Sequence, residues 1–345
     1  MTDEAHTETI IRALVDPALT LNRHLDVLDA NAAARDVFGG VRIGQHISLT
    51  TRNPEMASAV ADALRLKQRR RFVLDIRTPL DRRLEGIATP LHVADGTETA
   101  AAVLISLRDL TEQERLSAMR ADFVANASHE LRTPLASLKG FIETMQGAAR
   151  NDVAAQGRFL EIMSQQADRM TRLIDDLLSL SRIEMRAHIP PSAKVDLNDI
   201  ANSVVAALEP QAKLAGATVT LHKFAGVAIV RGDTDELVQA VQNLVQNAIK
   251  YGRAGGHVDV QIGEDGPGQR TISTIDDGPG IAPEHLPRLT ERFYRINVAS
   301  SRDRGGTGLG LAIVKHIVTR HRGQLAITST VGHGATFKIT LPAIA

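Results

Sequence analysis

Residues 123–145 of the chain read FVANASHELRTPLASLKGFIETM. Apolar residues recur every three to four positions through this region, as in an amphipathic helix. His129 and Thr133 are four residues apart and would share one helix face, with Glu130 beside the imidazole. An exposed histidine can accept a phosphoryl group while the neighbouring carboxylate orients it or takes its proton. The structural alternative is a surface histidine beside a Glu–Arg cluster.

A second helical segment follows the first. The apolar spacing resumes from Phe159 to Leu178, after a turn zone between Gly147 and Gly157. Residues 111–187 are therefore expected to form a helical hairpin. One hairpin cannot bury a continuous apolar stripe alone, so we expect two copies to pair into a four-helix bundle. Prolines at 190 and 191 end the helical pattern, and 188–194 reads as a linker.

The flanking regions mix helix and strand patterns. In residues 1–110 we expect an α+β sensor-like module, with strands within 18–31, 71–78, 82–93 and 100–110, a short helix ending at Gly39-Gly40, and a hairpin turn at Asp95-Gly96. The basic run at 67–71 reads as a solvated helix end. Residues 195–345 alternate helices and strands, which predicts an α/β sandwich of about 150 residues with its own core.

A polar stripe interrupts the apolar pattern of the predicted helix at 233–252. Asn243, Asn247 and Lys250 lie at i, i+4 and i+7 on one face. Two amides and an ammonium suit a hydrated divalent cation and phosphate oxygens. A solvated polar face is the alternative.

Two glycine-rich segments follow. Asp276 ends a predicted strand and precedes Gly278 and Gly280, so its carboxylate can accept a hydrogen bond from the amino group of a base, or it can simply close a turn. GGTGLGLAIVK (305–315) opens directly into a helix, where backbone N–H groups favour phosphate. It matches neither a Walker A loop nor a dinucleotide fingerprint, and a flexible linker is its alternative.

Composition excludes several classes of function. Lys plus Arg and Asp plus Glu each number 40, so no cationic surplus is available to bind nucleic acid. The absence of cysteine excludes disulfides, zinc-thiolate sites and thiol nucleophiles. The longest apolar run, 100–105, is far shorter than the roughly 20 residues that span a bilayer. We expect a cytoplasmic protein, soluble as given, or a fragment of a longer protein attached to the inner membrane.

In this order, the motifs resemble those of the sensor histidine kinases of bacterial two-component systems. SHELRTPL resembles the H box, and residues 243–251, 276–280, 291–295 and 306–311 resemble the N, G1, F and G2 boxes. Residues 1–110 resemble a PAS domain. The segments 123–152, 172–184 and 286–296 are also similar to the phosphate-regulon (PhoR-type) sensor kinases.

The resemblance implies a multidomain α+β protein. It would hold a PAS-like α/β module (1–110), a helical hairpin that forms a dimeric four-helix bundle (111–187), a linker (188–194) and an α/β sandwich with a Bergerat-type ATP pocket (195–345). The homodimer would form through 111–187. No nucleic-acid partner is implied, and a membrane would be involved only through a longer, membrane-anchored kinase.

The resemblance also implies roles for single residues. His129 would accept the ATP γ-phosphate, Glu130 would tune the imidazole, and Thr133 would help to dephosphorylate a partner response regulator. The phosphoryl group would pass to an aspartate of that regulator. In the nucleotide site, Asn247 would bind Mg²⁺, and Asn243 and Lys250 would contact phosphates. Tyr251 and Asp276 would contact adenine. The ATP pocket and its lid, roughly 282–305, would be shaped by Gly278, Gly280, Gly306, Thr307, Gly308, Leu309 and Gly310.

Two alternatives stay open. A degenerate kinase acting as a signalling scaffold or phosphatase only would not label His129. A mechanical ATPase of the Hsp90 or MutL kind would turn over ATP without a phosphoenzyme. Related ATPases carry a glutamate at the position of Asn243, and an amide cannot take a proton from water. We therefore expect ATP to be kept intact until His129 arrives.

Overall fold

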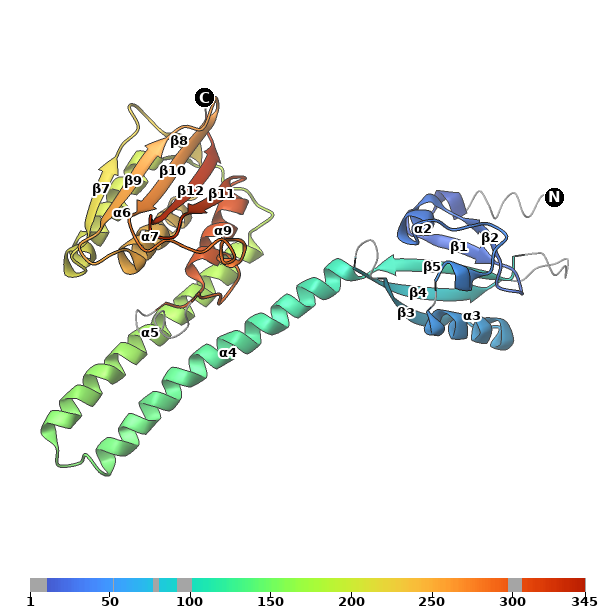
Figure 1. Cartoon of the computed structure of the whole chain (residues 1–345), viewed down its shortest axis with the longest axis horizontal. Coiled ribbons are helices and arrows are strands. Elements are labelled where there is room, and N and C mark those ends of the chain that lie inside the picture. The colour runs from blue at the N-terminus through green and yellow to red at the C-terminus, as the bar shows by residue number, and fades with distance from the viewer. Residues whose placement is uncertain (1–10, 52, 77–80, 92–100, 297–305, 345) are drawn as a thin grey trace. The chain divides into compact units, whose positions relative to one another are not determined.

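Helices and strands form two compact units, residues 1–124 and 125–345, in a computed structural model (Figure 1). The structure describes residues 11–51, 53–76, 81–91, 101–296 and 306–344. The hairpin turn expected at Asp95-Gly96 lies outside the described residues, as does part of the expected lid.

The first unit is built on a five-stranded antiparallel sheet with the order β2-β1-β5-β4-β3. The central strand β5 follows β4 in the chain but also pairs with β1, which joins the beginning and the end of the unit. The strands confirm those expected from the sequence to within a few residues. They are β1 (Ala18–Leu21), β2 (Val27–Ala30), β3 (Arg70–Ile76), β4 (Arg82–Pro90) and β5 (Val103–Asp109).

Short helical segments accompany this sheet in the described part of the unit. The short helix α2 (Ala32–Val37) confirms the prediction, whereas η1 (Ile47–Leu49) and α3 (Pro54–Leu66) were not predicted. Asn53 caps α3 by accepting from the Met56 amide, and Lys67 ends the helix in the left-handed conformation. The basic run at 67–71 is therefore only partly a helix end, because its last two arginines already belong to β3.

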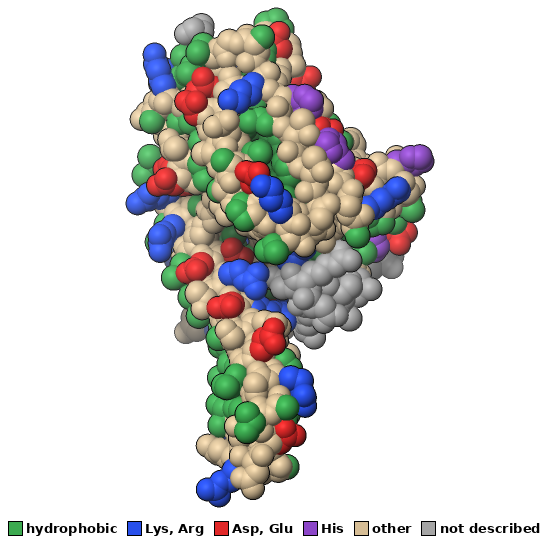
Figure 2. Space-filling view, turned by 90° about the vertical axis from the view of Figure 1, so that its left-hand side faces the viewer, with side chains coloured by type: hydrophobic (Ala, Val, Ile, Leu, Met, Phe, Trp, Pro, Cys, Tyr) green, Lys and Arg blue, Asp and Glu red, His purple; other side chains and the backbone are tan. Residues whose placement is uncertain are grey.

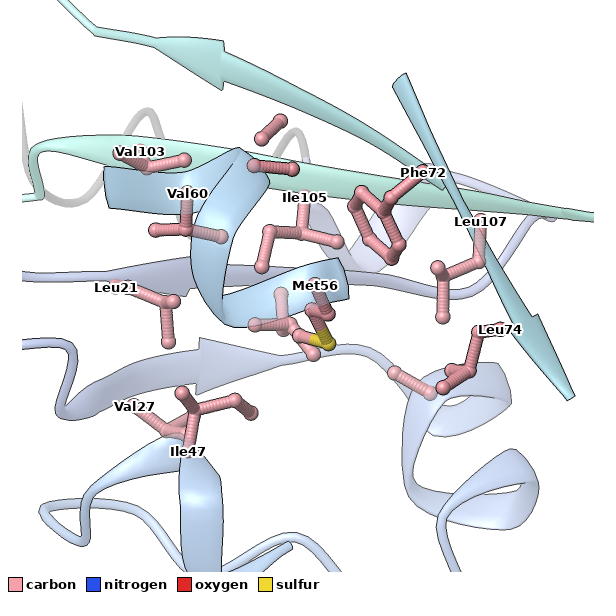
Figure 3. Close-up of a cluster of buried hydrophobic side chains, with 14 of the residues drawn as sticks. Leu21, Val27, Ile47, Met56, Val60, Phe72, Leu74, Val103, Ile105 and Leu107 are labelled. Atoms are coloured by element: carbon pink, nitrogen blue, oxygen red, sulfur yellow. The ribbon is translucent and has the colours of Figure 1, made fainter. Parts of the chain in front are cut away.

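Helix α3 buries its apolar face on the sheet. Alternate residues of β4 and β5 point toward it, as expected for strands with one covered face. Met56 and Val60 of α3 pack among Ile105, Leu107 and Phe72 of the strands (Figure 3). The unit thus has a core of its own.

The second unit begins within the long helix α4 (Thr111–Gln146), which turns back into α5 (Val153–Met185). Asp152 caps α5 by accepting from the Ala155 amide at 2.9 Å. The rings of Phe141 and Phe159 lie 5.2 Å apart and join the two helices. The predicted helical hairpin is confirmed, but Gly157 lies inside α5, so the turn is shorter than expected.

Large apolar side chains remain exposed along the hairpin. Leu135 and Leu160 are 57% and 58% exposed, and Ile174 and Leu178 are also exposed. Figure 2 shows hydrophobic side chains gathered along one side of the narrow helical part. Of these residues, Ile174 and Leu178 belong to the apolar stripe that the sequence predicts, and their exposure confirms that one hairpin leaves part of it unburied.

The rest of the second unit is a five-stranded sheet covered on one face by helices. The order is β11-β12-β10-β9-β7, with β7 and β9 parallel and all other pairs antiparallel. Helix α7 packs on the central strands between α6 and α9. The elements are α6 (Leu197–Leu214), β7 (Thr218–His222), α7 (Thr234–Tyr251), β9 (His257–Gly263), β10 (Gln269–Asp276), α9 (Gly310–Arg320), β11 (Gln324–Ser329) and β12 (Ala335–Pro342).

These elements confirm the expected alternation of helices and strands, including the helix expected at 233–252, and Asp196 and Asp233 cap α6 and α7. A small sheet of β6 (Lys194–Asp196) and β8 (Ile229–Arg231) and the short helix η2 (Leu286–Arg288) were not predicted. Strand β6 connects the end of α5 to the sandwich, so the stretch expected to be a linker ends in ordered structure.

Candidate active site

His129 lies on the exposed surface of α4. The hydroxyl of Thr133 donates to the backbone carbonyl of His129 at 3.2 Å, so the two residues lie one turn apart on one side of the helix. Pro134, the next residue, is buried. An exposed imidazole on a helix anchored at this point is accessible to a second protein domain or to a partner protein.

Glu130 does not face solvent like its neighbour. Its Oε2 atom accepts from Nη2 of Arg169 on α5 and from Nη2 of Arg295 in the α/β sandwich, both at 3.0 Å. The three side chains are 4% to 14% exposed, so the ion pairs are shielded from water. The carboxylate beside His129 therefore connects both helices of the hairpin to the sandwich.

The polar stripe of α7 lies half-buried beside the loop that leads into α9. The Asn243 amide donates to the Gly310 carbonyl at 3.5 Å. Burial, together with the nearby guanidinium groups of Arg172 and Arg295, lowers the pKa of Lys250 to about 8. A partly desolvated ammonium among arginines favours an anionic ligand.

Asp276 lies at the end of β10, and its Oδ1 accepts from the Gly278 amide at 2.9 Å. Burial raises the pKa of its carboxyl group. Two residues earlier on the same strand face, the hydroxyl of Thr274 is buried and has no hydrogen-bond partner among the described residues. Together they offer hydrogen-bonding groups that a bound base can satisfy.

Glycines allow these segments to approach closely. A Cβ on Gly278 would lie 2.7 Å from Asp276 Oδ1 and 3.1 Å from the Tyr251 carbonyl. Gly308 has a φ of +75°, and a Cβ there would meet the Phe293 backbone at 2.9 Å. Only glycine fits such positions without displacing its neighbours.

The structure brings the predicted nucleotide residues together at three neighbouring places. Asn243, Asn247, Lys250 and Tyr251 come from α7, Asp276, Gly278 and Gly280 from the end of β10, and Gly306, Thr307, Gly308, Leu309 and Gly310 from the start of α9. Residues 297–305 of the expected lid lie outside the described residues.

Sequence reasoning missed several participants. Asp176 of α5 accepts a 2.7 Å hydrogen bond from the Thr307 hydroxyl, and Arg169 and Arg295 share Glu130. Each contact joins residues that lie 39 to 165 positions apart. The local spacing of residues does not predict such pairs, because they form only when the sandwich packs against the hairpin.

Two protein families match this chain. Residues 119–186 match the His Kinase A (phospho-acceptor) domain. Residues 232–345 match the histidine kinase-, DNA gyrase B- and HSP90-like ATPase family. The chain belongs to the sensor histidine kinases. In this kinase the phosphoacceptor family covers the hairpin and the ATPase family covers most of the sandwich.

Curated proteins similar to this chain are sensor proteins and sensor protein kinases. The phosphate regulon sensor protein PhoR of Pseudomonas aeruginosa is 41% identical over 235 residues, which cover 68% of this chain and 52% of that protein. The sensor protein kinase WalK of Staphylococcus saprophyticus is 31% identical over 347 residues, which cover 99% of this chain and 55% of that protein. The kinase spans about half the length of these relatives.

Solved structures share the fold of the kinase. Histidine kinase ThkA, in a complex with the response regulator protein TrrA, superposes with a TM-score of 0.54 over 98% of both chains, at 21% identity. AdeS of Acinetobacter baumannii gives a TM-score of 0.50 at 25% identity, covering 63% of this chain and 98% of that one. Among the residues that the structure describes, the kinase has no helix both long and apolar enough to cross a membrane.

Proposed function

We propose that this chain is an ATP-dependent protein-histidine kinase that phosphorylates itself on His129. The observation that carries the proposal is the ion pair of Glu130 with Arg295, which connects the residue beside His129 to the domain of the ATPase family. A phosphoacceptor and a nucleotide domain in contact within one chain fit phosphoryl transfer, which depends on positioning.

The proposed reaction is a direct displacement. The Nε2 lone pair of His129 attacks the γ-phosphorus of ATP while the bond to the oxygen bridging the β- and γ-phosphates breaks, and ADP leaves. The phosphorylated imidazole loses its Nδ1 proton, for which Glu130 is the nearest carboxylate in the sequence. Asn243 cannot activate water, because an amide does not accept a proton at neutral pH.

The residues present fit ATP and Mg²⁺. Lys250 and Thr307 supply donors for phosphate, Asp276 supplies an acceptor for the adenine amino group, and the unpartnered Thr274 hydroxyl provides a further group for the base. The amide oxygen of Asn247 would bind Mg²⁺. The ion, when bound, would neutralise charge on the phosphates.

Partners follow from the same chemistry. We propose that phosphohistidine passes its group to an aspartate of a response regulator. Thr133 would help to place the water that later hydrolyses this aspartyl phosphate to inorganic phosphate. The exposed stripe of the hairpin supports a homodimer through 111–187. The N-terminal unit, with its own α/β core, would act as the PAS-like sensor. ATP is available in the cytoplasm, where we place these domains.

The test is incubation with γ-labelled ATP and Mg²⁺. The wild type and a His188→Gln control, which removes another exposed histidine, should both take up acid-labile, alkali-stable label. His129→Gln should take up none. Label on His129→Gln equal to the wild type would refute the assignment. Binding of an ATP analogue without any label would favour the scaffold alternative.

A finer proposal concerns the pathway. The chain is 41% identical to PhoR over 235 residues, so we propose that the partner regulator controls genes of phosphate starvation. Phosphotransfer from labelled kinase to a panel of purified response regulators would test it. Faster transfer to any other regulator would overturn this assignment while leaving the kinase activity intact.

A further inference from the structure

A carboxylate of the phosphoacceptor hairpin lies among the donors proposed for ATP phosphates. Oδ2 of Asp176 on α5 accepts from the Thr307 hydroxyl at 2.7 Å. Lys250 is close enough that the charges of Asp176 and Lys250 act on each other's pKa. Thr307 and Lys250 are two of the groups to which the proposed function assigns phosphate contacts. Asp176 thus lies close to both.

Asp176 is partly buried and lies beside a hydrogen-bond donor and cations that favour an anion. Burial raises the pKa of its carboxyl group, and the charge of Asp175 raises it further. The Thr307 hydroxyl and the charges of Arg172 and Lys250 act in the opposite direction. A carboxylate and a phosphate group accept the same kinds of hydrogen bond from such donors. The two anions repel each other, so they do not share one set of donors at low cost.

The same pattern recurs along this contact. Arg292 pairs with Glu184 of α5, and Arg295 pairs with Glu130 of α4. In all three pairs the hairpin supplies the carboxylate and the sandwich supplies the donor. Figure 2 shows acidic and basic side chains gathered where the narrow helical part meets the wider one.

We propose that Asp176 is an internal phosphate mimic, which occupies donors of the nucleotide site and must be displaced when ATP binds. This inference rests on the proposed function, because it requires a nucleotide at this site. Displacement breaks the bond between Thr307 and α5, so nucleotide binding loosens the contact of the sandwich with the hairpin. The same event frees the sandwich to move toward His129.

The test is calorimetric titration of the full chain with Mg²⁺ and the non-hydrolysable analogue AMP-PNP. Asp176→Asn keeps the shape of the side chain but removes its charge, and it should tighten AMP-PNP binding by about 5-fold. Asp175→Asn is the matched control, since it removes an exposed charge one residue away. It should leave the affinity within about 2-fold of the wild type.

Titration with adenosine distinguishes competition between Asp176 and phosphate from a structural role of Asp176. Adenosine has no phosphates, so its affinity should be the same in the wild type and in Asp176→Asn. Unchanged or weaker AMP-PNP binding in Asp176→Asn would overturn the inference, because Asp176 would then support Thr307 rather than compete with phosphate. An equal gain for adenosine would also overturn it. Failure of every variant and the wild type to bind AMP-PNP would instead refute the proposed function itself.

Discussion

Arg295 donates from Nη2 to Oε2 of Glu130 at 3.0 Å, across 165 residues of sequence. Arg169 donates to the same oxygen atom, so two guanidinium groups share one carboxylate. The residue beside the proposed phosphoacceptor is therefore engaged by the domain that would deliver ATP. We therefore predict two separable roles for Glu130, one in docking and one in accepting a proton.

Glu130→Gln and Arg295→Gln separate these roles. Both variants weaken the ion pair, but only Glu130→Gln removes the proposed base. We expect autophosphorylation to fall by about 100-fold in Glu130→Gln and by less than about 10-fold in Arg295→Gln. Initial rates of label incorporation at saturating ATP would measure this. Equal losses in the two variants would show that docking alone matters.

The lowered pKa of Lys250 predicts a pH dependence of nucleotide binding. Without nucleotide, Lys250 loses its charge as the pH rises through about 8. Phosphate binding favours the charged form, so the affinity for AMP-PNP should fall by about 5-fold between pH 8 and 9. Lys250→Arg stays charged and should bind with little change over this range. The same slope in both proteins would assign the effect to another group.

The free energy of unfolding should depend on pH in the opposite direction to the affinity for AMP-PNP. The folded pKa of about 8 lies below the unfolded value, so the unfolded chain binds more protons between the two. In the absence of nucleotide, the contribution of Lys250 to the free energy of unfolding should increase from pH 8 toward pH 10. Urea denaturation of the wild type and Lys250→Met across this range would show the difference.

Asn31 should be a stability determinant of the N-terminal unit. Its Oδ1 accepts from the amides of Ala18 and Ala34, and its Nδ2 donates to the carbonyls of Leu14 and Asp16. Asn31→Asp would place a buried carboxylate against two carbonyl oxygens and should lower the free energy of unfolding by about 3 kcal/mol.

Hydrogen exchange in β1 would report the loss locally. Asn53→Asp is the control, because Asn53 only caps α3 and aspartate caps a helix equally well. It should change stability by less than about 0.5 kcal/mol. Comparable losses in both variants would contradict the argument from the four hydrogen bonds of Asn31.

Gly86 should be intolerant of a side chain. It lies opposite Phe72 in the β3–β4 pair, and an added Cβ would lie 2.1 Å from the Phe72 ring. Gly86→Ala should destabilise the first unit by about 2 kcal/mol, and adding Phe72→Leu should recover part of that loss. Thermal melts of the two single variants and the double variant would measure the coupling. An additive double variant would exclude the steric cause.

Local signals predicted most of the secondary structure, and the reasons are visible at single residues. Asp196 and Asp233 cap α6 and α7, and such caps are local signals because they depend on residues within three positions. Helix α3 escaped prediction although Asn53-Pro54 is a start signal of the same kind. Gly157 was assigned to a turn because glycine is more common there, but packing of the hairpin keeps it helical.

Some features of the site could likewise be predicted from local sequence, and others could not. The stripe of Asn243, Asn247 and Lys250 follows from helical spacing and needs no tertiary knowledge. The partners of Glu130 and Thr307 come from docking of distant segments, which one sequence does not encode locally. The roles of these residues in catalysis stay predictions until the variants are measured.

Arg320 gives the end of α9 a mechanical role. Its Nε donates to the carbonyls of Arg186 and Ile189, just beyond the end of α5, while Glu236 of α7 pairs with its guanidinium. At its other end α9 begins at Gly310, beside Asn243. The eleven residues of α9 form a rigid helix about 16 Å long between these two contacts. A rotation at the C-terminal end of α5 would therefore displace the glycine-rich loop, without any change in the loop's own sequence.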